Sequence, residues 1–166
     1  MISYNLDVID VSAAFFHCAK FYPSNIPITH KKLQNLIYYA QGFSMLHNGK
    51  KIFDDGFEIV GYGVICRRLY DVYKGISYNR ITDKMVKGDC KNVIRNVDVF
   101  NVLCNVWKAF RNLTGSQLEI MVHRDFPFAN AVKNNHSTIS DNDMMTFFNK
   151  ELMKNDWCKN LQKQQT

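Results

Sequence analysis

The sequence predicts a mainly α-helical protein: a single compact helical domain with a small β-hairpin after the second helix. Apolar residues recur at spacings of three and four along several long segments, which is the period of a helix with one buried face. Two short extended pieces flank an Asp-Gly turn between residues 51 and 63, which is typical of a hairpin. The 166 residues are 46% hydrophobic and 22% charged, enough for one domain with a closed core. We expect this domain over residues 1–155 and a flexible C-terminal tail over residues 156–166.

The first predicted helix spans residues 7–21. Asp7 is suited to cap it, because its carboxylate can accept a hydrogen bond from a free backbone amide. Pro23 and Pro27 follow and predict a loop, since proline cannot donate to a helical ladder. The apolar face of the helix consists of Val8, Val11, Ala14, Phe15, Cys18 and Ala19.

The second predicted helix runs from a Thr29 cap to Asn48, and Gly49 ends it by taking the left-handed conformation. Its second half is apolar almost all round, which indicates a central helix contacted on more than one side. The expected buried positions are Leu33, Leu36, Ile37, Ala40 and either Phe43 or Ser44, and the expected edge positions are Lys32, Asn35 and Tyr39.

A hairpin and a third helix are predicted next. Residues 52–53 and 57–60 are the two extended pieces, joined by the turn at residues 54–56. The third helix is expected over residues 64–74, and residues 75–96 are interpreted as a connecting loop with one or two strands. The inward positions of the third helix are Ile65, Leu69, Val72 and Tyr73.

The C-terminal half predicts further helices, each with a recognisable start. Asp98 is expected to cap a long helix over residues 99–112. Its apolar residues recur at helical spacing: Val99, Val102, Leu103, Val106, Trp107 and Phe110. Residues 116–119 have the pattern of a capping box that opens a short helix to residue 123, and Pro127 suits the first position of another. Residues 140–143 form a second capping box, which predicts the final helix.

The net charge of +6 comes from 21 Lys and Arg residues against 15 Asp and Glu residues. The basic residues are scattered and form no block of five or six like charges, which favours a solvated surface over a dedicated nucleic-acid patch. Residues 84–95 are rich in Lys and Arg, and nucleic-acid binding through them stays an alternative.

The cysteine count and the hydropathy pattern predict a cytoplasmic protein. The five cysteines are an odd number with no C-x-x-C pair, which argues against a disulfide framework and a zinc site. No segment approaches the roughly 20 uninterrupted apolar residues that a membrane span requires. The N-terminal segment carries acidic residues where a secretory leader would carry Lys or Arg, so we expect neither export nor membrane association.

The sequence contains none of the common catalytic or nucleotide-binding motifs. Cys104 and His123 could pair as nucleophile and base, but Cys104 falls in an apolar helix, where thiols behave as small hydrophobic groups. Asp54 and Asp55 are interpreted as turn residues, because a metal ion would need further oxygen ligands. We therefore predict no enzymatic activity, no metal and no cofactor.

The run Tyr38-Tyr39-Ala40-Gln41 places polar groups on a helix that is otherwise apolar. Each buried hydroxyl or amide must find a partner or cost roughly 1–3 kcal/mol. One interpretation is that these groups brace the interior. The other is that Tyr39 and Gln41 line a groove that a partner contacts.

The segment from Lys32 to Gln41, K-L-Q-N-L-I-Y-Y-A-Q, resembles the Panacea antitoxin domain, also called SocA-like or GepA-like. That family has K-L-Q-K-L-L-Y-Y-A-Q, then a small hairpin and W-x-Y-G-P-V leading into a helix. Ile52-Phe53-Asp54-Asp55 and Tyr62-Gly63 continue the likeness, which covers residues 7–150. The chain departs from the pattern at Val60, where the family has Trp, and it lacks the Pro after Tyr-Gly.

The resemblance implies a non-enzymatic protein that binds and neutralises a toxin encoded beside it, on a phage, prophage or plasmid. One branch of the family acts as an adaptor that delivers its toxin to a protease. The alternatives are a mobile-element inhibitor of a host protein and a basic nucleic-acid-binding regulator.

If protein binding is the function, the expected contact residues are Tyr39, Gln41, Tyr62, Arg67 and His123. Tyr39 and Gln41 would form a polar floor, and Tyr62 an aromatic wall. Arg67 would contact a carboxylate or phosphate, and His123 would be a hydrogen-bond hub.

Overall fold

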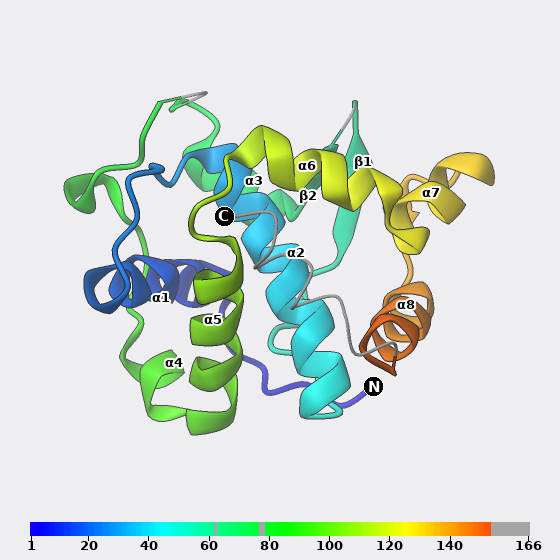
Figure 1. Ribbon diagram of the computed structural model, residues 1–166, viewed down its shortest axis with the longest axis horizontal. Coiled ribbons are helices and arrows are strands. Elements are labelled where there is room, and N and C mark those ends of the chain that lie inside the picture. The colour runs from blue at the N-terminus through cyan, green and yellow to red at the C-terminus, as the bar shows by residue number, and fades with distance from the viewer. Residues whose placement is uncertain (62, 77–78, 154–166) are drawn as a thin grey trace.

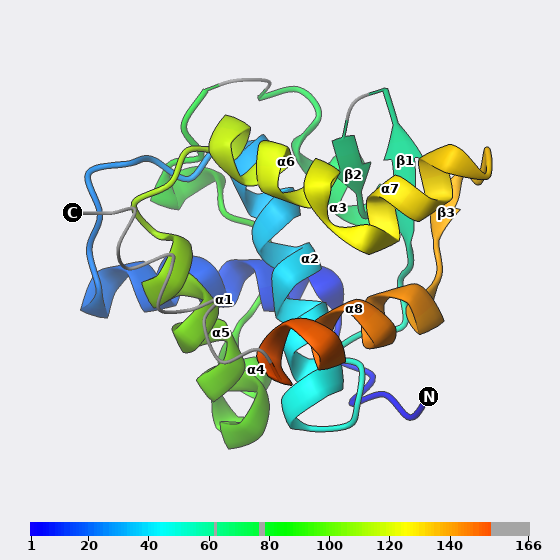
Figure 2. The same ribbon diagram turned by 45° about the vertical axis from the view of Figure 1, so that its right-hand side comes forward.

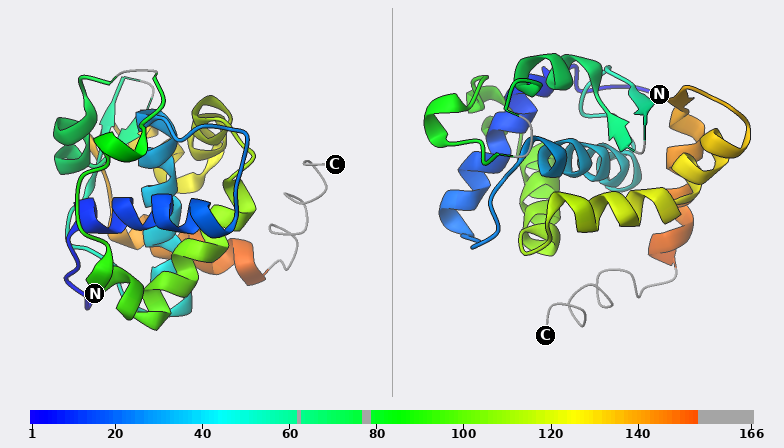
Figure 3. Two further views of the ribbon diagram at one scale, coloured as in Figure 1. Left: turned by 90° about the vertical axis from the view of Figure 1, so that its left-hand side faces the viewer. Right: turned by 90° about the horizontal axis from the view of Figure 1, so that it is seen from above.

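A long helix runs through the middle of the protein, and the other elements pack around it (Figure 1). The computed structural model describes residues 1–61, 63–76 and 79–153. The central helix is α2 (His30–His47), and in the view from above it lies between its neighbours (Figure 3). Its helical neighbours are α1 (Val8–Phe21), α3 (Arg67–Tyr73), α5 (Val97–Phe110), α6 (Gly115–Arg124) and α8 (Asp141–Met153). The prediction of a mainly helical fold with a small β element is confirmed.

The first two predicted helices are confirmed together with their caps. Asp7 accepts a 2.8 Å hydrogen bond from the amide of Ile9 at the start of α1. Thr29 accepts one of 3.2 Å from the amide of Lys32 at the start of α2. Gly49, just beyond α2, has a φ of 65°, the left-handed conformation that glycine adopts without strain.

The hairpin exists, but the sequence placed its turn wrongly. Strand β1 (Phe57–Val60) pairs antiparallel with β2 (Gly63–Ile65), so the turn follows Val60 rather than lying at residues 54–56. On its other side β1 pairs with β3 (Thr138–Ile139), giving the order β2-β1-β3, and Figure 2 shows β3 beside β1. The segment at residues 52–53 stays outside this sheet because Gln41 of α2 binds its backbone.

The third helix is shorter than predicted, because residues 63–65 belong to β2. Leu69 and Tyr73 of α3 are buried as expected, whereas Val72 is 38% exposed and was assigned inward wrongly. The connecting region contains the short helices η1 (Asp83–Met85) and α4 (Lys91–Arg95).

The C-terminal helices exist where the sequence predicts them, with two shifted starts. Asn96, rather than Asp98, caps α5, and its side chain accepts from the amide of Val99. The capping box of α6 is formed by Thr114 and Gln117, two residues before the predicted one. Pro127 lies in the first turn of α7 (Phe126–Lys133), as predicted. The Ser140 hydroxyl accepts from the amide of Asp143 at the start of α8.

The hydrophobic core is continuous and is built on the predicted apolar faces of α1, α2 and α5. The whole predicted stripe of α5 is buried: Val99, Val102, Leu103, Val106, Trp107 and Phe110. The core also contains groups that the sequence placed at its edge, since Lys32 and Tyr39 have no exposed surface and Asn35 has 3%. In the described part of the chain no helix is long and apolar enough to cross a membrane.

Replacing Gly42 by Ala should destabilise the fold, although Ala favours a helix by about 1 kcal/mol. A methyl group at Gly42 would overlap the ring of Phe148, which is 2% exposed and cannot move into solvent. Overpacking of this kind costs about 1–3 kcal/mol, so we expect a net loss of about 1 kcal/mol in the free energy of unfolding by urea. The control is Gly56→Ala, because nothing lies within 4 Å of the added methyl group. Equal midpoints for the two variants would contradict close packing of α2 against α8.

Candidate partner-binding site

Tyr39 lies in the interior and connects α2 to the junction of α6 and α7. Its hydroxyl donates a 2.8 Å hydrogen bond to the carboxylate of Asp125, and its ring lies 4.8 Å from that of Phe110. Burial and the negative charge of Asp125 raise the pKa of Tyr39 well above its ordinary value. The Tyr39 hydroxyl therefore stays protonated and continues to donate.

Tyr38 is equally buried but differs from its neighbour in hydrogen bonding. Its hydroxyl has no hydrogen-bond partner among the described residues. Its ring packs edge-on against Phe57 at 5.7 Å, so the contribution of Tyr38 is aromatic packing. The two adjacent tyrosines therefore have different structural roles.

Gln41 holds the segment at residues 52–53 against α2. Its amide oxygen accepts from the backbone amide of Ile52 at 2.7 Å, and its amide nitrogen donates to the carbonyl oxygen of Phe53 at 2.8 Å. The side chain thus bonds an extended segment through one donor and one acceptor, as a neighbouring strand would.

Gln34 also holds an extended backbone segment against α2, at Cys66. It was not among the predicted site residues. Its amide oxygen accepts from the backbone amide of Cys66 at 2.8 Å, and its nitrogen lies 3.4 Å from the carbonyl oxygen of the same residue. Gln34 and Gln41 are seven residues apart, which places them on one face of α2. That spacing in the sequence is the signal that could have identified Gln34.

Lys32 is a fully buried cation that connects α2 to the end of α5. Its ammonium group donates to the carbonyl oxygen of Arg111 at 2.5 Å and lies 5.1 Å from the ring centroid of Trp107. Burial lowers the pKa of Lys32 to about 8. Together with Gln34, Tyr39 and Gln41, Lys32 supports the interpretation of the motif as internal bracing.

Arg67 is the predicted site residue that lies on an open, charged surface. It is 47% exposed at its side chain and forms a 2.6 Å ion pair with Glu58 of β1. Beside it, Arg68 forms ion pairs with Asp7 at 2.6 Å and with Asp55 at 3.3 Å. Both arginines, Glu58 and Asp55 border a hollow of about 470 Å³, here named the charged hollow. It is lined by Lys51, Asp55, Gly56, Phe57, Glu58, Arg67, Arg68, Thr138, Ile139 and Asp141.

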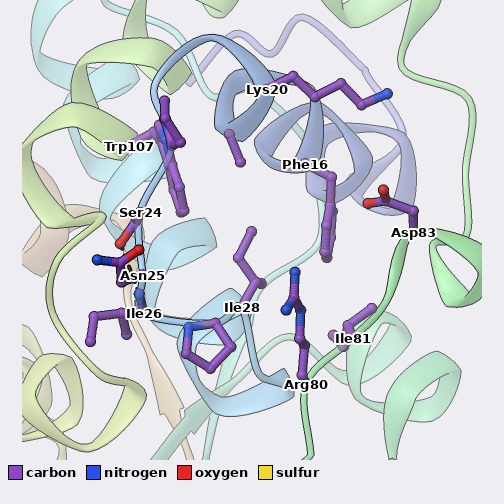
Figure 4. Close-up of a pocket in the computed structure, with 13 residues that line it drawn as sticks. Phe16, Lys20, Ser24, Asn25, Ile26, Ile28, Arg80, Ile81, Asp83 and Trp107 are labelled. Carbon is purple, nitrogen blue, oxygen red and sulfur yellow. Dashed lines mark hydrogen bonds between the residues drawn. The ribbon is translucent and has the colours of Figure 1, made fainter.

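A second hollow of about 280 Å³ lies between the end of α1 and the loop that leads into α2 (Figure 4). Trp107 and Phe16 stand on opposite sides of it, Ile28 lies between them, and Arg80 extends toward Phe16. None of the predicted site residues is in its lining.

The remaining predicted residues that the structure describes are not in the lining of the charged hollow. His123 is half-buried on α6, and its ring stacks on Phe128 with 4.6 Å between centroids. Tyr62 lies outside the described residues. Tyr39 and Gln41 have at most 1% of their surface exposed. Their direct contact with a partner stays a prediction, as does that of His123.

No metal cluster is apparent in the described ranges: no three His, Cys, Asp or Glu side chains are placed there to share an ion. What the arrangement offers is an exposed surface of paired charges, held by buried hydrogen bonds of α2. Such a surface is suited to recognition of another macromolecule.

Replacing Tyr39 by Phe should lower the free energy of unfolding by about 1–3 kcal/mol, because the buried Asp125 carboxylate loses a donor. Urea denaturation measures the effect. The matched control is Tyr38→Phe, which removes a hydroxyl that has no partner within the described residues and should be neutral or slightly stabilising. An equal loss in both variants would contradict the Tyr39 hydrogen bond.

The buried Lys32 should make stability depend on pH. Its pKa is depressed to about 8 in the folded protein, so between pH 8 and its ordinary value of 10.5 the unfolded chain binds more protons. The stability contributed by this residue therefore rises with pH across that range. The free energy of unfolding of the native protein minus that of Lys32→Met should increase by about 2 kcal/mol from pH 8 to pH 10. A constant difference in urea denaturation would show that Lys32 has an ordinary pKa.

Comparison with family models identifies one match. Residues 33–127 match the model described as antitoxin SocA-like, Panacea domain. No curated protein and no solved structure matches the chain. The matched region includes most of α2, the two glutamines that it buries and the α3 segment with Arg67. The protein therefore belongs to the SocA-like antitoxin family that carries the Panacea domain.

Proposed function

We propose that the protein neutralises a cognate toxin protein by binding it directly through the charged hollow. The observation that supports this proposal is the family match, which supports a role of the toxin–antitoxin kind, without enzymatic activity, and with a toxin protein as the partner. The location of the contact is our inference from the described surface.

The charges of the hollow favour a protein partner over a nucleic acid. Its lining holds three cationic side chains, Lys51, Arg67 and Arg68, and three anionic ones, Asp55, Glu58 and Asp141. A polyanion would meet repulsion from the carboxylates as well as attraction from the cations. A protein surface can present both signs at matching positions, which gives specificity.

The ion pairs of the hollow can change partners at low cost. Arg67 and Glu58 are 47% and 38% exposed at their side chains, and pairs as exposed as this contribute about 0–1 kcal/mol. Arg67 reaches Glu58 through both Nε, at 3.1 Å, and Nη2, at 2.6 Å. The same guanidinium edge could bind a carboxylate of the toxin with two hydrogen bonds.

The two buried glutamines hold two of the segments that line the charged hollow. Gln34 bonds to the backbone of Cys66, directly before Arg67, and Gln41 bonds to Ile52 and Phe53, which lie between Lys51 and Asp55 in the sequence. We therefore assign Gln41 a positioning role. In the proposal Tyr39 has a similar role at the α6–α7 junction, while Tyr62 and His123 would extend the contact beyond the hollow.

The test of the antitoxin activity is co-expression with the protein encoded by the adjacent gene. We expect the neighbouring product to stop bacterial growth alone and growth to resume when this chain is present. An unchanged toxin level during rescue would indicate inhibition by binding, whereas a fall in that level would indicate delivery to a protease. Absence of a growth-inhibiting neighbour, with retention of this chain on arbitrary DNA and a steep salt dependence, would favour the nucleic-acid alternative.

Arg67→Glu should weaken toxin binding about tenfold or more, because it places a like charge beside Glu58 and removes the donor offered to the toxin. Isothermal titration calorimetry with the purified toxin measures the change. The matched control is Arg95→Glu, which makes the same charge change on α4, outside the charged hollow. Equal weakening by both variants would mean that net charge, rather than this site, drives the binding.

A further inference from the structure

Two thiols from different helices meet in the core. Cys18 of α1 and Cys104 of α5 are 86 residues apart in the sequence, and their sulfur atoms are 3.4 Å apart. The two helices pack against each other along this contact (Figure 1). Cys18 has no exposed surface, whereas Cys104 is only partly buried.

We propose that Cys18 and Cys104 form an intramolecular disulfide when the protein meets hydrogen peroxide. The bond requires the sulfur atoms to approach from 3.4 Å to about 2.05 Å. The proposed function does not involve this pair, and neither cysteine lines the charged hollow.

The difference in exposure sets the order of the two steps. Cys104 is the partly exposed member of the pair, so in the proposal its thiolate attacks a peroxide oxygen, the O–O bond breaks, and the products are a Cys104 sulfenic acid and water after proton uptake. The Cys18 sulfur then attacks the Cys104 sulfur and displaces the hydroxyl group, which leaves as water with the Cys18 proton. Two thiols and one peroxide thus give one disulfide and two waters, with two electrons passing from sulfur to oxygen.

Burial is consistent with Cys18 acting second. Its enclosure, together with the neighbouring thiol of Cys104, raises the pKa of Cys18, so it is protonated and poorly reactive toward a dissolved oxidant. Once Cys104 is oxidised, however, the Cys18 sulfur is already in contact with its target, which makes the second step intramolecular.

Cys90 is the rival for this chemistry. It precedes α4, is half-buried, and is close enough to Cys18 to influence its titration. The described contacts place a sulfur atom of Cys104, and not of Cys90, against Cys18. A Cys90→Ala variant therefore separates the two pairings without removing the proposed bond.

The disulfide would join α1 to α5 and close a long loop of the chain. A disulfide lowers the conformational entropy of the unfolded chain more when the loop it closes is longer. We therefore expect the oxidised protein to melt about 5–15 °C higher than the reduced protein, and the difference to disappear after treatment with a thiol reductant. The oxidised and the reduced protein should bind the toxin equally well. Failure of the disulfide proposal would therefore leave the proposed function standing, and failure of the proposed function would leave the disulfide proposal standing.

The experiment treats the full chain with one equivalent of hydrogen peroxide, alkylates the remaining thiols in denaturant and maps the peptides without reduction. We expect free thiols to fall from five to three, and a linked peptide pair containing Cys18 and Cys104 that is about 2 Da lighter than the two free peptides. Cys90→Ala should give the same linked pair, and Cys104→Ala should keep its four thiols. The inference is wrong if all five thiols remain, if Cys104 proceeds to sulfinic acid unpaired, or if Cys18 is linked to Cys90.

Discussion

The burial of polar side chains on α2 is the constraint on which the rest of the structure depends. Lys32, Gln34, Asn35, Tyr39 and Gln41 are all at most 3% exposed, and an unpaired polar group in such a place costs about 1–3 kcal/mol. Each therefore requires a particular partner on another segment. Lys32 binds the end of α5, Gln34 the start of α3 and Asn35 the start of α6. Tyr39 binds Asp125, and Gln41 binds residues 52–53. The hydrophobic effect has no preferred direction, whereas each of these hydrogen bonds requires a particular distance and angle. The hydrogen bonds therefore fix the positions of these segments more narrowly.

This constraint also links the interior to the surface. Gln34 binds the backbone of Cys66, next to Arg67, and Gln41 binds the backbone of Ile52, next to Lys51. Both neighbours line the charged hollow, so the interior of the protein helps to set its shape. The exposed ion pairs above it add little to stability and are free to evolve toward a particular partner.

The errors of the sequence-based predictions have physical causes. Local patterns favoured a turn at residues 54–56, but Gln41 occupies the backbone of residues 52–53 that a hairpin there would need. Two capping residues were misplaced because Asn96 and Thr114 can accept the same backbone hydrogen bonds as the predicted Asp98 and Ser116. Each true cap lies two residues earlier in the chain than the predicted one. Lys32 and Asn35 were placed at an edge because polarity argues against burial, and partners that are 79 and 80 residues away override that preference.

The sequence by itself determined the helices other than η1 and α4, most of their buried faces and ends, and the family, because these follow from local periodicity, capping chemistry and a short motif. Tertiary structure alone decided which polar groups of the motif are internal, where the strands pair, and that Arg67 lies in the charged hollow beside Glu58. It also brought Cys18 to Cys104. Each of these depends on contacts between residues far apart in the chain, and such contacts leave no periodic trace in the sequence.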